Sequence, residues 1–170
     1  MGMTTVFEGC FMVDRPLDQD TFELLRGLET TRRMKRNVPE VYGIEGEFYI
    51  DGKGFMGQDD EPNVIDSNTP PITQPDLWLN WHVLEDKMTI EWNQREKFYH
   101  SYDWIVYIVE RILEPRGYTL NGAVNAITEY NEIYHIDVTE NKCKLARRHT
   151  KKAGKPDFAK WVEEDLKKWS

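Results

Sequence analysis

The sequence is poor in cysteine and has no long hydrophobic run. Its two cysteines, Cys10 and Cys143, are too few for a disulfide scaffold and lack the clustered partners of a zinc site. The longest apolar run, residues 104–109, is far short of the roughly 20 residues that span a bilayer. No basic segment followed by an apolar one opens the chain, so no export signal is expected. These absences predict a cytoplasmic protein with reduced core cysteines, and no membrane, metal or cofactor is expected.

The composition is that of one globular domain. Hydrophobic residues make up 39% and charged residues 31% of the 170 residues, a balance that disfavours disorder. The formal net charge is −8. Thirteen acidic residues against three basic ones lie between residues 40 and 96, whereas residues 142–155 hold seven basic residues and no acidic one. Such separated charge can orient a partner but does not identify one.

Hydrophobic periodicity predicts an α+β fold. Asp20 and Glu23 resemble a capping box, which predicts that a helix begins there. Alternating residues predict a hairpin, and a second helix ends at Pro115 and Gly117. The expected strands span residues 5–13, 47–50, 77–84, 88–93, 118–127, 132–138 and 143–145, and the second helix spans 101–113. This order predicts a mainly antiparallel sheet with two helices on one face and a C-terminal amphipathic helix.

The C-terminal part is expected to stand apart from the main body. Residues 1–146 are predicted to form the α+β domain, and residues 147–170 a basic linker followed by the C-terminal helix. The apolar face of that helix would carry Phe158, Trp161, Val162, Leu166 and Trp169. The helix either packs on its own domain or forms a homo-oligomer through Trp161, Leu166 and Trp169.

A long loop beside the tryptophan-rich hairpin is the leading candidate for a binding surface. Residues 52–75 hold many glycines, prolines and carboxylates, and a loop of this length in a compact domain is often functional. They match neither a phosphate-binding glycine loop nor a calcium loop. The predicted contact residues for a protein or small ligand are Asp59, Asp60, Trp78, His82 and Trp92.

Two other functions remain open. Basic residues could bind nucleic acid or nucleotides, although a solvated helix end and a linker would also explain them. These residues are Arg32, Arg33, Lys35, Arg36, Arg147 and Arg148. A metal-dependent enzyme is the third hypothesis, and its candidate group is Asp59, Asp60, His82 and Glu91. No nucleophile motif supports it, so no catalytic residue is assigned.

Four segments resemble small uncharacterised proteins encoded by bacteriophages, prophages and some bacteria. The segments are residues 46–60, residues 74–81, Glu91-Trp92 with residues 97–99, and residues 117–122. The likeness covers roughly residues 40–125, and the chain from Arg147 onward falls outside it. The resemblance implies an accessory factor of a phage or mobile element, acting in the host cytoplasm. Such a factor would be a non-enzymatic binding protein that inhibits or sequesters a host protein or small ligand.

Overall fold

A seven-stranded antiparallel sheet forms the body of the molecule. The computed structural model describes residues 4–37, 64–149 and 160–163. The strands are β1 (Thr5–Val13), β2 (Lys35–Arg36), β3 (Val64–Asp66), β4 (Trp81–Val83), β5 (Thr89–Trp92), β6 (Leu120–Thr128), β7 (Ile133–Thr139), β8 (Lys142–His149) and β9 (Lys160–Glu163). The main sheet has the order β4-β5-β1-β6-β7-β8-β9, and β2 pairs with β3 in a separate ribbon.

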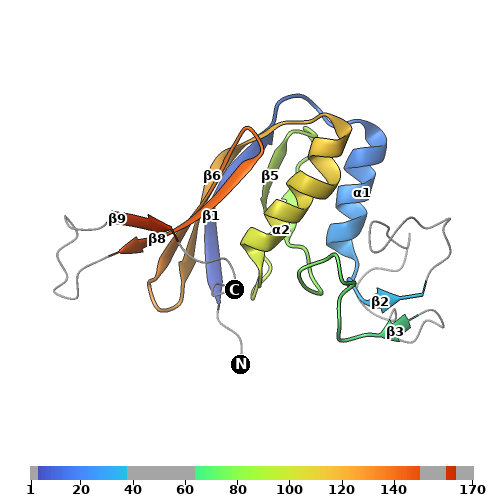
Figure 1. Cartoon of the computed structure of the whole chain (residues 1–170), viewed down its shortest axis with the longest axis horizontal. Coiled ribbons are helices and arrows are strands. Elements are labelled where there is room, and N and C mark those ends of the chain that lie inside the picture. Colours follow the sequence, from blue (N-terminus) through green and yellow to red (C-terminus); the bar gives the residue numbers. More distant parts are fainter. Residues whose placement is uncertain (1–3, 38–63, 150–159, 164–170) are drawn as a thin grey trace.

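Two helical segments cover one face of this sheet (Figure 1). They are α1 (Gln19–Thr30) and α2 (Ser101–Tyr107), and α2 continues as a π-helical turn over Ile108–Leu113 and a 3₁₀ turn over Glu114–Arg116. Gly117 ends this run in a left-handed conformation, with φ of 80°. The predicted α+β fold is thus confirmed, and within the described residues no helix is long and apolar enough to cross a membrane.

The core lies between the helices and the sheet. An aromatic group at its centre surrounds Phe7, whose ring centroid lies 5.5 Å from that of Trp81 and 5.3 Å from that of Trp92. Trp81 is almost fully buried, and its indole N–H donates to the carbonyl of Ser101 at 2.9 Å. The β4–β5 hairpin therefore holds the start of α2 against the sheet.

Helix α1 begins two residues before the predicted position. Asp18 is the N-cap, because its carboxylate accepts from the backbone N–H of Thr21 at 2.8 Å. This bond lowers the pKa of Asp18, and a hydrogen bond from the Tyr118 hydroxyl lowers it further. Buried Leu17 and Phe22 flank the cap at the positions of a hydrophobic staple. The capping box predicted at Asp20 is therefore wrong, because the buried pair aligns the helix on Asp18.

The free edge of β4 is covered by α1. Arg26 donates from Nε to the carbonyl of Val83 at 2.7 Å and forms an ion pair with Glu85 at 3.2 Å. Arg26 also lies over the ring of Phe22, at 4.7 Å from its centroid. The helix is thus anchored along the edge strand by its own arginine.

Two glycines with positive φ face the backbone of the neighbouring strand in the β1–β6 pair. Gly9 has φ of 110° and Gly122 has φ of 142°, values that side-chain-bearing residues rarely adopt. A Cβ atom at Gly122 would lie 2.7 Å from the Cα of Phe11, its partner in the register. A Cβ atom at Gly9 would lie 2.4 Å from the carbonyl oxygen of Ala123. The central strand pair therefore requires glycine at both positions.

The structure differs from the prediction in the last strands. Strand β8 runs to His149, so Arg147 and Arg148 lie in the sheet and the predicted linker does not begin at residue 147. Residues Lys160–Glu163, predicted as helix, form β9 and pair with β8. Leu166 and Trp169 lie outside the described residues, as does the predicted strand at residues 47–50. The pairing of β8 with β7 and β9 makes both segments strands. This pairing joins distant positions, so the local sequence does not predict it.

Candidate binding site on the open face of the sheet

The face of the sheet opposite the helices carries side chains that are largely accessible. Along β1, Phe7, Phe11 and Val13 point into the core, whereas Val6 and Met12 on the other side are 47% and 46% exposed. The same alternation continues through β6, β7 and β8. We call this surface, formed by the outward positions of β1, β6, β7 and β8, the open face.

The strand register arranges the open face in rows that cross the strands. The first row is apolar and runs from Val6 through Ile127 to Ile133. The second row is polar and consists of Glu8, Asn125, His135 and Ala146. The third row consists of Cys10, Ala123, Asp137 and Lys144. An apolar strip therefore lies directly beside charged residues, a mixture that resembles the rim and core of a protein interface.

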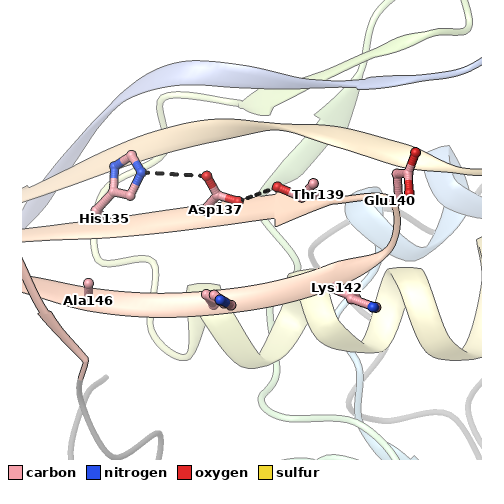
Figure 2. Close-up of a pocket in the computed structure, with 7 residues that line it drawn as sticks. His135, Asp137, Thr139, Glu140, Lys142 and Ala146 are labelled. Carbon is pink, nitrogen blue, oxygen red and sulfur yellow. Dashed lines mark hydrogen bonds and ion pairs between the residues drawn. The ribbon is translucent and has the colours of Figure 1, made fainter.

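A hollow of about 500 Å³ lies at the β7–β8 end of the open face (Figure 2). It is lined by His135, Asp137, Thr139, Glu140, Lys142, Lys144 and Ala146. These residues come from β7, from the turn that follows it and from β8. The short side chain of Ala146, directly opposite His135, leaves room between longer neighbours.

Hydrogen bonds orient the side chains of β7 in the hollow. His135 Nδ1 lies 2.8 Å from the side-chain oxygen of Asn125, and His135 Nε2 lies 3.8 Å from a carboxylate oxygen of Asp137. The hydroxyl of Thr139 donates to the other carboxylate oxygen of Asp137 at 2.8 Å. Figure 2 shows these three β7 side chains in a line along the strand. This arrangement presents donors and acceptors in fixed positions, which suits recognition of a polar group.

The strand β8 contributes positive charge to the same face. Lys142, Lys144 and Arg148 occupy alternate outward positions and are all exposed. We call these three residues the β8 cation column. Arg147 lies between them on the opposite side of the strand, where it pairs in register with Tyr134. The predicted nucleic-acid residues Arg147 and Arg148 therefore face opposite sides of the sheet.

A second polar cluster lies at the β4 end of the sheet. Glu29 of α1 is only 4% exposed, and its carboxylate lies 2.7 Å from His82 Nδ1. The other oxygen of Glu29 accepts from the side-chain amide of Asn93 at 3.2 Å. Glu91 is directly opposite His82 in the hairpin register, so these two side chains share a face. A buried carboxylate needs hydrogen-bonding partners, and both partners of Glu29 come from the hairpin and the residue after it. The cluster therefore holds α1 against the hairpin.

The predicted partner-binding residues are only partly brought together. Trp92 faces the core with Trp81, and its indole N–H donates to the carbonyl of Arg95 at 3.0 Å. His82 alternates to the other side of the same hairpin. Trp78 is half-buried, and the guanidinium of Arg32 lies 6.0 Å from its ring centroid. Asp59 and Asp60 lie outside the described residues. Trp92 and His82 therefore do not form one contact surface.

The basic residues near the end of α1 do not form the surface expected for nucleic-acid binding. Arg33 is 3% exposed, and it donates to the side-chain oxygen of Gln74 at 3.1 Å and to the hydroxyl of Thr31. Burial lowers the pKa of Arg33 to about 10. The side-chain amide of Gln74 donates in turn to the hydroxyl of Tyr107 at 3.0 Å. Arg33 is a structural residue of the interior, so its prediction as a phosphate contact is wrong.

The neighbours of Arg33 are more accessible. Arg32 is half-buried and donates to the carbonyl of Ser67 at 3.0 Å, which fixes its guanidinium locally. Lys35 is exposed and Arg36 is half-buried, and both lie in the short strand β2. Lys35 and Arg36 alternate along this strand, so their side chains point to opposite sides of it. The predicted basic run is thus divided between the interior and two surfaces.

The structure describes only two of the four residues proposed for a metal-dependent enzyme. His82 and Glu91 are neighbours, whereas Asp59 and Asp60 fall in the undescribed range 38–63. Across the described residues, no group of three or more His, Cys, Asp or Glu is arranged to hold a metal ion. Cys143 packs at the edge of the core, and burial raises its pKa to about 12, which keeps this thiol protonated.

The sequence reasoning missed the residues of the hollow. His135 and Asp137 alternate with buried residues on β7, and Lys142 and Lys144 do the same across the turn on β8. This polar alternation on two adjacent strands was a usable signal, because it marks one shared face. No protein-family model, curated protein or solved structure matches the chain.

Proposed function

We propose that this chain is a non-enzymatic binding protein and that its open face contacts a partner protein. The observation that carries the proposal is the accessible apolar row beside the polar hollow. Val6, which belongs to this row, is nearly half exposed, and Met12, further along β1 on the same face, is exposed to a similar extent. The helices fill the opposite side of the sheet (Figure 1). Exposed apolar side chains on such a face favour association with another protein.

The mixture of side chains favours a protein partner over a small apolar ligand. Six of the seven residues that line the hollow are polar or charged, which favours a partner that forms hydrogen bonds and ion pairs over a wholly apolar ligand. Rows of apolar and polar residues side by side provide burial and directional bonds together. The resemblance of residues 40–125 to phage-encoded proteins leads us to propose a host protein that the chain inhibits or sequesters.

Affinity capture with matched surface variants tests the proposal. The immobilised protein is exposed to a host lysate, and captured proteins are compared between wild type, Val6→Glu and Ile72→Glu. Ile72 is 91% exposed in the segment between β3 and β4, so its replacement adds the same charge away from the open face. We expect one captured protein to bind wild type and Ile72→Glu at least tenfold more tightly than Val6→Glu, as for a central interface residue.

The measurement is then repeated with the purified partner by calorimetry, and the three proteins are first shown to melt at similar temperatures. Equal affinity of the partner for Val6→Glu and wild type would remove the open face as the contact surface. The absence of any protein that binds the wild type specifically would contradict the proposed function itself.

A further inference from the structure

We propose that the β8 cation column binds an acidic, extended segment of the partner protein. This inference rests on the proposed function, since it specifies which part of a partner contacts the β8 end of the open face. The column consists of Lys142, Lys144 and Arg148, and His135 lies beside it on β7. The occupant is defined by its chemistry as a peptide segment with carboxylates at alternate positions.

No described side chain neutralises the three cations. Within the described residues, none of their side chains forms an ion pair or hydrogen bond. Lys144 stands opposite Asp137 in the register, but the carboxylate of Asp137 instead accepts from Thr139 and approaches His135. By contrast, Arg15 and Arg26 elsewhere on the surface each pair with a carboxylate. None of the described side chains therefore neutralises the column, which favours attraction of an external anion.

The spacing of the cations suits an extended chain. Alternate residues of a strand are roughly 6.5 to 7 Å apart on the same side, because each residue rises about 3.3 Å. Lys142 and Lys144 are one such step apart, and Arg148 lies two steps beyond Lys144, with Ala146 between them. An extended peptide presents its own alternate side chains at the same interval. Two carboxylates of such a segment would therefore meet Lys142 and Lys144 together.

The hollow beside the column offers the segment further contacts. The hydroxyl of Thr139 and the ring of His135 lie on its β7 side, and Lys142 and Lys144 lie on its β8 side. Ala146 leaves space for a side chain of the segment beside His135, between Lys144 and Arg148 of the column. The apolar row that starts at Val6 continues the same face, so a partner bound through both features contacts apolar and charged groups at once.

Nucleic acid fits the column less well than an acidic protein segment. The carboxylates of Asp137 and Glu140 line the same hollow and would repel a phosphate backbone. The chain as a whole carries a formal charge of −8, which opposes long-range attraction of a polyanion as highly charged as DNA. A protein segment tolerates this mixture, because it can place a neutral or basic residue beside Asp137.

The test uses three synthetic probes and a charge-reversal variant. The probes are a capped decapeptide of alternating Glu and Ser, a capped decapeptide of alternating Lys and Ser, and single-stranded oligothymidine. Binding to each is measured by fluorescence anisotropy at about 50 mM and about 200 mM salt, a range over which contacts between charged groups weaken strongly. The proteins are wild type, Lys142→Glu/Lys144→Glu, and the control Lys35→Glu/Lys97→Glu, which reverses two exposed charges elsewhere.

We expect the Glu–Ser peptide to bind wild type and the control variant, and to bind Lys142→Glu/Lys144→Glu at least tenfold more weakly. We also expect the reversed variant to gain affinity for the Lys–Ser peptide, a readout that unfolding cannot produce. Tighter binding of oligothymidine than of the Glu–Ser peptide would overturn the inference in favour of nucleic acid. Equal binding of the Glu–Ser peptide to all three proteins, or none at low salt, would also overturn it. The Val6→Glu comparison tests the proposed function independently, so the two failures are distinguishable.

Discussion

Replacement of Gly122 by alanine should destabilise the protein severely. At φ of 142°, an alanine is strained, and such a backbone costs about 1 to 3 kcal/mol. Its Cβ would also lie 2.5 Å from the carbonyl oxygen of Cys10 and 2.7 Å from the Cα of Phe11. Both atoms belong to the backbone of β1, which is held between β5 and β6, so neither can move freely. Overpacking of this kind costs about 1 to 3 kcal/mol more.

The two effects together predict a loss of about 2 to 6 kcal/mol in the free energy of unfolding. A domain of this size loses roughly 2 to 4 °C in Tm per kcal/mol, so the melting temperature should fall by about 10 °C. Urea denaturation followed by tryptophan fluorescence measures the free energy, and circular dichroism measures the Tm. Gly9→Ala should behave similarly, because its Cβ would meet the carbonyl oxygen of Ala123 at 2.4 Å.

Gly117→Ala is the matched control. Gly117 also has a positive φ, of 80°, but a Cβ there would meet only the flexible end of Arg15, at 3.6 Å. The strain remains and the overlap is absent, so we expect a loss of only about 1 kcal/mol. Equal destabilisation by Gly117→Ala and Gly122→Ala, or a Gly122→Ala variant within about 1 kcal/mol of wild type, would refute the close approach of β1 and β6.

Three further substitutions or measurements test other parts of the structure. Asp18→Ala should lower the free energy of unfolding, measured by urea denaturation, by about 1 kcal/mol, and Asp20→Ala by under about 0.5 kcal/mol. A larger loss for Asp20→Ala than for Asp18→Ala would instead support Asp20 as the N-cap. Arg33→Ala should cost about 2 kcal/mol and Arg32→Ala under about 1 kcal/mol, because only Arg33 leaves buried hydrogen-bonding partners. At pH 8 the pKa of Cys143, raised to about 12 by burial, leaves about one thiolate in 10,000, so native protein should resist iodoacetamide at this residue in peptide mapping. The ordinary thiol pKa is 9.0, so the raised pKa of Cys143 should stabilise the folded protein below pH 9, and this contribution should be lost as the pH rises toward 12. Rapid labelling of Cys143 in the native protein at pH 8 would contradict the raised pKa on which this dependence is based.

The elements with strong local periodicity were predictable. Strand β1 matches the expected residues 5–13, because apolar residues alternate along it and Pro16 follows. The helical run from Ser101 agrees with the expected 101–113, because its apolar positions repeat at helical spacing. In both cases the pattern within one segment decides which side is buried.

The parts that depend on distant partners were not predictable. Arg147 and Arg148 read as a solvated linker, yet pairing with β7 on one side and β9 on the other makes them strand residues. Arg33 read as part of a basic surface, yet contact with Gln74, 41 positions later in the chain, holds it inside. The hollow also depends on register, since Ala146 and His135 face each other only after β7 and β8 pair. Such pairings join positions that no local pattern relates.

The covered edge of β4 limits how the sheet can grow. Helix α1 packs against β4, and Arg26 donates a hydrogen bond to the carbonyl of Val83, so a further strand cannot add there without displacing the helix. Within the described residues, any extension of the main sheet is thus confined to the β9 end. Two copies joined through β9 would be related by a two-fold axis and would share one main sheet. The covered β4 edge therefore opposes strand-by-strand growth of the main sheet.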